Sequence, residues 1–241
     1  MSATKKLVVR VWRGGADGAF QSFEVPRHES QTVLDVVTHI QRALDPTLAY
    51  RFACRVGMCG SCAMTVNGQA RWTCRTHVDA VVGGNAEMTI APLRNLPVIR
   101  DLVTDMREFF DKWARARGSF KGSRTRKDAF EKIRPDTAAR EDVDAAIECI
   151  GCGVCYASCD VVAWNPDYLG PAALNRAWTL ARDERDAAGD ERLRAIAGDA
   201  GAHACHTHQS CTERCPKKLS PTAGIAGLKR ELSRALLKGK L

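Results

Sequence analysis

The stretch CRVGMCGSC, residues 54–62, decides the fold of this chain of 241 residues. It places three of the eleven cysteines in one short loop, and eight more follow it. The N-terminal KKLVVRVW has neither the apolar segment nor the cleavage site of a signal peptide, so we expect a reducing compartment in which disulfides are rare. The odd number of cysteines argues in the same direction. We therefore expect the cysteines to bind metal.

The first four cysteines have the spacing C-x4-C-x2-C-x11-C. This spacing is typical of the plant-type ferredoxin loop that holds a [2Fe–2S] cluster. Gly57 and Gly60 allow sharp turns that point backbone N–H groups at sulfur. A structural zinc site is less consistent with the spacing, because it more often uses two C-x2-C pairs. The predicted [2Fe–2S] ligands are Cys54, Cys59, Cys62 and Cys74.

The remaining seven cysteines form two groups. The first has the spacing C-x2-C-x2-C-x3-C, and the second has C-x5-C-x3-C followed by Pro216. In bacterial ferredoxins the fourth cysteine of such a run binds the other cluster. This crossing predicts Cys149, Cys152, Cys155 and Cys215 as the ligands of a [4Fe–4S] cluster. It leaves Cys159, Cys205 and Cys211 for a second cluster, and three thiolates suit a [3Fe–4S] cluster.

One histidine stands where a full motif would carry a cysteine, at position 208. Histidine binds iron in Rieske centres, so His208 either completes a [4Fe–4S] cube or only covers a trinuclear cluster. We favour the covering role. It predicts about nine irons per chain, and the alternative predicts about ten.

Residues 1–104 have the pattern of a small sheet crossed by one helix, which is a compact α+β domain. Asn67-Gly68 is a strong hairpin signal. The helix begins at Thr32, in TVLDVVTHIQRAL, with Val33, Val36, Val37, Ile40 and Leu44 on one face. The predicted strands are Leu7–Trp12, Phe20–Val25, Cys62–Val66, Gln69–Thr73 and Glu87–Ile90.

The second half of the chain has helical patterns and no strand signal. Pro97–Arg117 has helical spacing, with Ile99, Val103, Met106 and Phe110 on one face, and residues 118–127 (GSFKGSRTRK) predict an exposed loop. Further predicted helices are Glu141–Glu148, Pro171–Arg182, Glu191–Ala197 and Pro221–Leu237. We expect a [2Fe–2S] domain over 1–104, a connecting helix and linker over 105–140, and a helical two-cluster domain over 141–241.

Charge and composition exclude several classes of protein. The net charge is +8, but only 6% of residues are aromatic, and a nucleic-acid surface would interleave basic and stacking side chains. We therefore expect no nucleic-acid partner. The basic stretches are either a solvated surface or an edge that faces a protein partner or anionic lipid. No run approaches about 18 apolar residues, so we expect no transmembrane helix.

The cysteine motifs resemble those of the iron–sulfur subunit of succinate dehydrogenase and fumarate reductase. The resemblance covers nearly the whole chain and rests on CRVGMCGSC, CIGCGVCYASC with WNPDYLGPAALNRAW after it, and CHTHQSCTERCPKKLSP. It implies an α+β chain with an N-terminal β-grasp, plant-ferredoxin-like domain and an all-α, bacterial-ferredoxin-like domain. It also implies that single electrons pass from FAD in a partner flavoprotein through the [2Fe–2S], [4Fe–4S] and [3Fe–4S] clusters to quinone, or in reverse.

The same resemblance implies partners and a place in the cell. The partners are the flavoprotein and a membrane anchor of one or more subunits, for which haem b is a candidate cofactor. The chain would lie on the cytoplasmic face of the bacterial inner membrane and serve the tricarboxylic acid cycle and respiratory chain. We expect no residue of this chain to perform chemistry on the dicarboxylate, because that belongs to the flavin.

Trp164 and His206 match the residues of this family that contact quinone beside the [3Fe–4S] cluster. Many members have Pro-Ser after the fourth cysteine of the run, whereas Asp160 and Val161 follow Cys159 here. This departure indicates a different anchor, as in members that use menaquinone or lack a proximal quinone site. The stretch LNRAWTLARDERD is closer to the fumarate reductase branch. Two alternatives stay open: a freestanding soluble multi-cluster carrier, and the iron–sulfur subunit of another flavoenzyme.

Overall fold

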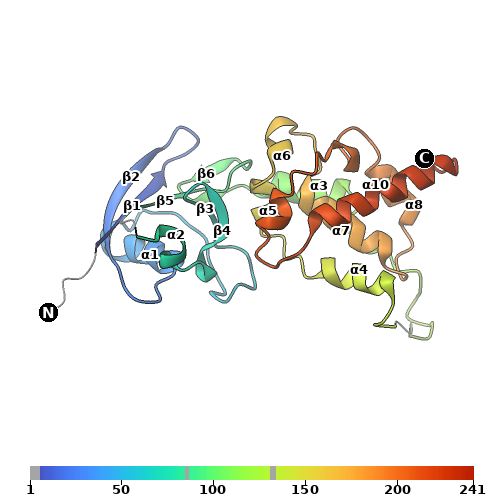
Figure 1. The fold of residues 1–241 in the computed structure, drawn as a ribbon, viewed down its shortest axis with the longest axis horizontal. Helices are drawn as coiled ribbons and strands as arrows, with labels where there is room; N and C mark the ends of the chain where they lie inside the picture. Colours follow the sequence, from blue (N-terminus) through green and yellow to red (C-terminus); the bar gives the residue numbers. More distant parts are fainter. Residues whose placement is uncertain (1–5, 85–86, 131–133) are drawn as a thin grey trace. The chain divides into compact units, whose positions relative to one another are not determined.

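The computed structural model describes residues 6–84, 87–130 and 134–241, and its elements are drawn in Figure 1. The chain divides into two compact units. The sheet unit comprises the chain up to Met106 together with Ile150–Ser158. The helical unit comprises Arg107–Cys149 and Cys159–Leu241. The second cysteine run, 149–159, therefore supplies cysteines to both units.

The sheet unit is built on a five-stranded sheet with the order β2-β1-β5-β3-β4 (Figure 1). Strand β1 pairs antiparallel with β2 and parallel with β5, and β3 pairs antiparallel with both β4 and β5. The turn between β3 and β4 is Asn67-Gly68, and both residues have positive φ, as the predicted hairpin requires. The strands are β1 (Lys6–Arg13), β2 (Ala19–Pro26), β3 (Ala63–Val66), β4 (Gln69–Trp72) and β5 (Glu87–Ala91). All five predicted strands are confirmed within a few residues.

Helix α1 (Val33–His39) supplies the helical part of this core. Its N-terminus is a capping box, in which Thr32 accepts from the Asp35 amide and Asp35 accepts from the Thr32 amide. Val33, Val36 and Val37 are fully buried, as predicted. The helix continues as a π-helical turn, η1 (Ile40–Leu44). Because this wider turn changes the register of the side chains, Leu44 is exposed, and its predicted place on the buried face is wrong.

The segment 97–106 is a correction to the predicted helix Pro97–Arg117. A short hairpin, β6 (Val98–Arg100) and β7 (Val103–Thr104), occupies its first half, and helix α3 (Arg107–Arg115) begins only afterwards. The chain reverses at Asp101, whose φ is 50°. The predicted apolar face is also wrong, because α3 buries Phe109 whereas Phe110 is 51% exposed.

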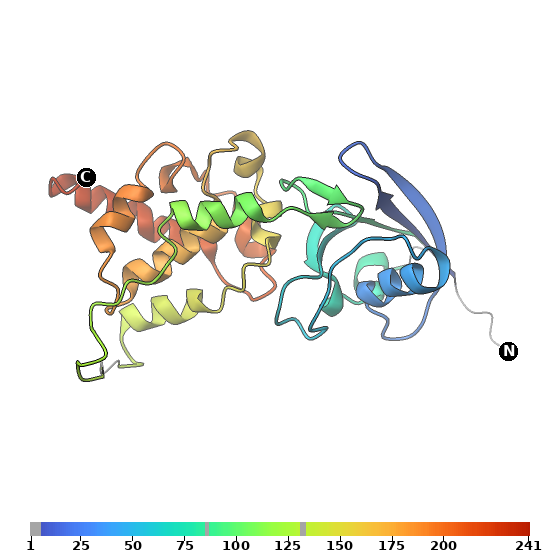
Figure 2. The same ribbon diagram turned by 180° about the vertical axis from the view of Figure 1, so that it is seen from behind.

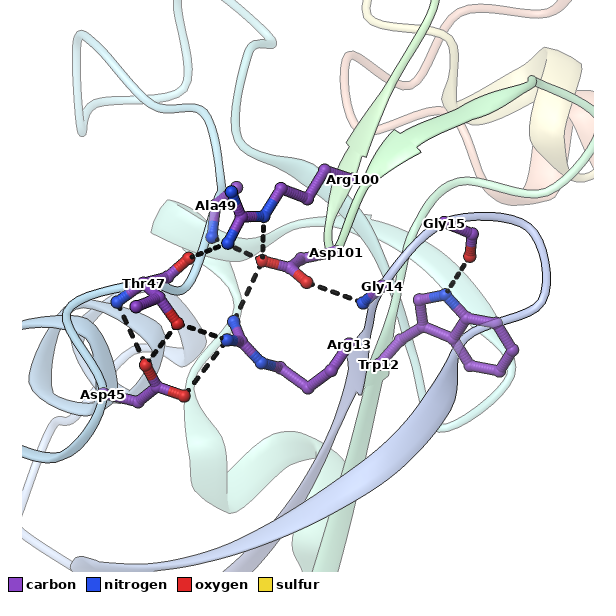
Figure 3. A network of polar contacts seen from close by, with 9 residues as sticks. All are labelled: Trp12, Arg13, Gly14, Gly15, Asp45, Thr47, Ala49, Arg100 and Asp101. Atoms are coloured by element: carbon purple, nitrogen blue, oxygen red, sulfur yellow. Dashed lines mark hydrogen bonds and ion pairs between the residues drawn. The ribbon is translucent and has the colours of Figure 1, made fainter.

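A buried carboxylate, Asp101, explains why the chain turns there (Figure 3). Its oxygens accept from the amides of Gly14 (2.7 Å) and Ala49 (2.8 Å) and from the guanidinium of Arg13 (2.9 Å). Arg13 in turn contacts Asp45 at 3.1 Å. The network joins three segments that are distant in sequence, and Ala49 leads directly into the first cysteine loop. Because hydrogen bonds to a charged group each contribute about 1.5–3 kcal/mol, the network fixes the start of that loop.

The helical unit is arranged around α7 (Gly170–Arg182), which packs against α3, α4, α8 and α10 (Figures 1 and 2). Its Trp178 lies against α10 where that helix has glycine, since a Cβ on Gly227 would lie 2.5 Å from the indole. The other elements of this unit are α4 (Ala138–Ile147), α6 (Asp160–Trp164), α8 (Gly189–Ala195), η3 (Ala202–Ala204), α9 (Ser210–Glu213) and α10 (Pro221–Leu237). The four helices predicted after residue 140 are confirmed, and α10 has the predicted bounds.

Several short elements were not predicted from sequence. They are α2 (Val78–Val82), η2 (Thr73–Arg75) and α5 (Val154–Ala157) in the sheet unit, and α6, α9 and η3 in the helical unit. Residues 118–127 form no helix or strand and are largely exposed, as predicted. Among the described helices, none has both the length and the apolar composition needed to cross a bilayer.

Candidate iron–sulfur sites

The loop of residues 54–62 curls around the sulfur of Cys54. The amides of Met58 and Cys59 both donate to Cys54 Sγ, at 3.2 and 3.3 Å. The turns that allow this are at Gly57 (φ 74°) and Gly60 (φ 70°), where a side chain would be strained. Backbone N–H groups directed at sulfur stabilise a thiolate, so this loop is built to hold charged cysteines.

The remaining thiols of the first motif gather at the same place. Cys62 and Cys74 are buried, and the Thr73 amide and hydroxyl both donate to the Cys62 carbonyl, at 3.2 and 2.8 Å. Cys74 interacts with the thiols of Cys62 and Cys54. The structure therefore brings together the four cysteines that the first spacing singles out.

These thiols differ in acidity, and each difference has a physical cause. A hydrogen bond with the Ser61 hydroxyl (3.0 Å) is the largest influence on Cys59 and lowers its pKa to about 6. Burial, followed by the neighbouring Cys62, raises the pKa of Cys74 to about 11. Iron binding requires the deprotonated thiolate, so the exposed, acidic Cys59 and the buried Cys74 suit a cluster that is half covered by protein.

The first loop also touches the second motif within the sheet unit. A Cβ on Gly60 would lie 2.5 Å from the Cβ of Cys152 and 2.9 Å from its Cα. Asn95 holds the following helix, α5, by donating to the Tyr156 carbonyl at 3.0 Å. Two of the second motif's cysteines, Cys152 and Cys155, are thereby anchored to the unit that carries the first four.

The other two cysteines assigned to this cluster, Cys149 and Cys215, belong to the helical unit. An ion pair between Glu148 and Lys217 (2.9 Å) joins the segments that carry them. Within that unit, the residues that flank the two cysteines are therefore in contact.

A third group of thiols lies inside the helical unit. Cys159 precedes α6, Cys205 follows η3, and Cys211 lies in α9. Burial raises the pKa of Cys159 and of Cys211, and the charge of Cys205 adds to it in both cases. The structure thus brings together the three cysteines that the count leaves for a second cluster. No three His, Cys, Asp or Glu side chains in the described ranges are placed to hold a single metal ion.

Tyr168 lies beside these three thiols, and the sequence alone does not predict a role for it. It is 1% exposed, and its hydroxyl forms a hydrogen bond with Cys205. Burial and the adjacent thiols, Cys205 first and then Cys159, raise its pKa, so the phenol keeps its proton. Its signal is weak: in the stretch WNPDYLGP a tyrosine follows Cys159 by nine residues. It supplies an O–H donor to the sulfur of Cys205.

An exposed aromatic group, the Trp164 face, lies at the C-terminal end of α6. It consists of Trp164, His206 and His208, whose ring centroids lie 5.6–6.5 Å apart. Trp164 is 66% exposed. His208 Nδ1 lies 3.7 Å from the carboxylate of Asp160. The imidazole therefore lies near Asp160 and Trp164, and the covering role of His208 stays a prediction.

Family models match both halves of the chain. Residues 7–111 match a 2Fe-2S iron-sulfur cluster binding domain, and residues 148–220 match a 4Fe-4S dicluster domain. Together with the three thiol groups, they define an electron carrier with several iron–sulfur clusters. The chain is 38% identical to the iron–sulfur subunit 1 of mitochondrial succinate dehydrogenase [ubiquinone] of Oryza sativa subsp. japonica, over 82% of this chain and 70% of that protein. It belongs to the family of succinate dehydrogenase iron–sulfur subunits.

Solved structures agree with this assignment. A chain of the Mycobacterium smegmatis Sdh1 complex in the apo form matches with a TM-score of 0.86 and 29% identity, covering 96% of this chain and 97% of that one. A hypothetical protein from Helicobacter pylori matches with a TM-score of 0.55 and 16% identity over 96% of this chain and 40% of that one, and shows only a shared fold. The predicted fold class is confirmed, and so is the predicted electron-transfer role in succinate dehydrogenase.

Proposed function

We propose that the chain relays single electrons between FAD in a flavoprotein subunit and quinone at a membrane anchor. When bound, the three clusters supply one-electron carriers between these two ends. The observation that carries the proposal is the contact of Gly60 with Cys152, because it places the first thiol loop against the second motif.

We assign the cysteines to the clusters as their spacing in the sequence predicts. Cys54, Cys59, Cys62 and Cys74 hold [2Fe–2S], with the amides of residues 58 and 59 directed at sulfur. For [4Fe–4S] the ligands are Cys149, Cys152, Cys155 and Cys215. For [3Fe–4S] they are Cys159, Cys205 and Cys211, with the buried Tyr168 beside them.

Trp164 and His206 are the residues that we assign to quinone. Both are exposed, and His206 follows Cys205 directly, so the Trp164 face lies beside the third thiol group. An indole offers a flat apolar surface to a quinone ring, and an imidazole N–H is a donor for its carbonyl oxygen. The anchor, with or without haem b, would cover this face at the cytoplasmic side of a bacterial inner membrane.

Iron analysis and EPR of the purified complex test the proposal. We expect about nine irons per chain, a [3Fe–4S] signal in the oxidised state, and reduction of the [2Fe–2S] cluster by succinate. Cys211→Ser should remove only the trinuclear signal, whereas His208→Gln should keep it. About ten irons without a trinuclear signal would make His208 a ligand. A chain that purifies without a flavoprotein and is not reduced by succinate would instead be a freestanding carrier or serve another flavoenzyme.

A further inference from the structure

The side chain of Thr222 lies against one of the cysteines of the third thiol group. Its Oγ1 is 3.4 Å from Cys211 Sγ, which is within hydrogen-bond reach of a sulfur atom. Thr222 belongs to the first turn of α10 and Cys211 to α9, so the contact joins two helices of the helical unit. A cysteine that binds iron is a thiolate and has no proton to give. In the loaded site the hydroxyl of Thr222 is therefore the donor.

A second threonine, Thr212, fixes the direction of the Thr222 hydroxyl. The Thr222 amide donates to Thr212 Oγ1 at 3.2 Å, and the Thr212 hydroxyl donates to Thr222 Oγ1 at 2.8 Å. A hydroxyl has a single proton to donate. Because the Thr212 proton already lies between the two oxygens, the Thr222 proton is left for Cys211 Sγ. The two threonines form a directed chain of donors that ends on the cysteine sulfur.

Backbone amides donate to all three sulfurs of this thiol group, and hydroxyls donate to two of them. The amides are those of Val161 and Val162 at Cys159, Thr207 at Cys205, and Thr212 at Cys211. The hydroxyls are those of Tyr168 at Cys205 and Thr222 at Cys211. An amide is held in place by the backbone, whereas a hydroxyl depends on one side chain. The Thr222 hydroxyl is thus a separate contribution that a single substitution can remove.

Burial strengthens this contribution. Cys211 is 8% exposed, so water has little access with which to replace the Thr222 donor. A hydrogen bond is electrostatically stronger in such a low-dielectric setting. Each electron that reaches a bound cluster adds one negative charge, and hydrogen bonds to the sulfurs stabilise the more negative state. The Thr222 hydroxyl should therefore favour the reduced state and raise the reduction potential.

We propose that Thr222 sets the reduction potential of the cluster held by Cys211, and that Thr212 is the residue that positions the Thr222 hydroxyl. A raised potential favours the electron at the thiol group that lies beside the Trp164 face. The inference rests on the proposed assignment of Cys211 to this cluster. It does not depend on the number of irons that the cluster contains.

Redox titration of the purified complex, followed by EPR, tests the role of Thr222. Thr222→Val keeps the size of the side chain but removes the donor. At a fixed ambient potential it should lower the ratio of reduced to oxidised cluster about three-fold, which is ~30 mV at 59 mV per ten-fold. Thr222→Ser keeps the hydroxyl and should keep the wild-type midpoint. The [2Fe–2S] midpoint should be the same in all these proteins.

Thr179→Val is the matched control. Thr179 is 1% exposed in the same unit, but its hydroxyl donates to the Asn175 carbonyl at 3.0 Å. The variant should leave the midpoint unchanged. Equal midpoints in wild type and Thr222→Val, or a Thr222→Ser midpoint as low as that of Thr222→Val, would overturn the proposal. A wild-type complex without a trinuclear signal would instead be a failure of the proposed cluster type.

A double variant tests whether Thr212 acts through Thr222. Thr212→Val should also lower the midpoint, whereas Thr212→Val/Thr222→Val should lie no lower than Thr222→Val, because the positioned donor is already gone. Shifts that add would show that Thr212 acts independently. Thr212→Val leaves the Thr222 side chain in place, so it tests the proposal even if Thr222→Val assembles without the cluster. An unchanged midpoint in Thr212→Val would contradict the positioning role.

Discussion

At the scale of single residues, the thiols of one motif are chemically unequal. The pKa of Cys59 is lowered to about 6, because Cys59 forms a hydrogen bond with the Ser61 hydroxyl, whereas burial raises the pKa of Cys74 to about 11. The spacing of the cysteines shows which residues meet, but the neighbours that set their acidity, such as Ser61, are seen only in the fold.

The acidity of Cys59 gives a pH-dependent prediction for the chain refolded without iron. Since the thiolate is the nucleophile and the Cys59 pKa is lowered to about 6, alkylation should be fast above this pH and decline below it. Ser61→Ala removes the largest cause of the lowered pKa. It should move the midpoint of the alkylation rate against pH towards the ordinary thiol pKa of about 8.5. Peptide mapping after timed alkylation measures this. Cys74 should stay unreacted near neutrality, and identical profiles for Cys59 in the two proteins would show that Ser61 has no such role.

Tyr168 should tune the trinuclear cluster, because hydrogen bonds to cluster sulfurs stabilise the reduced form. Tyr168→Phe removes only the hydroxyl that bonds Cys205, so the midpoint potential of that cluster should fall. We expect a change of about three-fold in the ratio of reduced to oxidised cluster, which is ~30 mV at 59 mV per ten-fold. Redox titration followed by EPR measures it.

Tyr50→Phe is the matched control for Tyr168→Phe, since it removes a hydroxyl that bonds Thr38 in the sheet unit. It should leave the trinuclear potential unchanged. Equal potentials in wild type and Tyr168→Phe would assign Tyr168 to packing alone.

At the scale of elements, the approach of the first loop to Cys152 depends on Gly60. Gly60→Ala adds a Cβ that meets the Cys152 backbone and also strains a residue at φ 70°. Gly68→Ala is the control, because its φ is 76° but its Cβ would meet nothing within 4 Å. We expect Gly68→Ala to cost about 1–2 kcal/mol through strain and Gly60→Ala at least ~1 kcal/mol more, with a weakened [2Fe–2S] signal.

Thermal unfolding and EPR of the reduced complex measure these two variants. A Gly60→Ala complex as stable as Gly68→Ala, with a full [2Fe–2S] signal, would show that the loop does not need its close approach to Cys152.

The sequence predicts an element correctly where the interactions that fix the element are local. The Asn67-Gly68 hairpin and the capped α1 helix are fixed by adjacent residues, and both were predicted. The β6–β7 hairpin was not, because its turn is held by Asp101 through Gly14 and Ala49, which are far away in sequence. The apolar residues of Pro97–Arg117 have helical spacing, but no helix forms before Arg107 because this network holds the turn at Asp101. Tyr168 escaped notice for the same reason, since its partner Cys205 lies on another segment.

At the scale of the whole molecule, both compact units carry thiol groups. In the sheet unit, the first group has one exposed thiol, Cys59, and the second motif touches its loop through Cys152. In the helical unit, the third group lies beside the Trp164 face. An electron carrier needs two accessible ends, and the chain provides one in each unit. We therefore expect the residues of the Trp164 face to matter for electron transfer to quinone and not for the reduction of the clusters.

This separation predicts that Trp164→Leu and His206→Gln uncouple quinone from the clusters. Succinate-dependent quinone reduction by the complex should fall at least ten-fold, about 1.4 kcal/mol in transition-state stabilisation, because each variant would remove a contact that we propose with the ring. Succinate should still reduce all three clusters in EPR and should still drive reduction of ferricyanide. Phe110→Leu removes another exposed aromatic ring from the helical unit and should retain full quinone reduction. If both variants keep wild-type quinone rates, the quinone contact lies elsewhere, whereas loss of the trinuclear signal would mean that the Trp164 face supports the cluster.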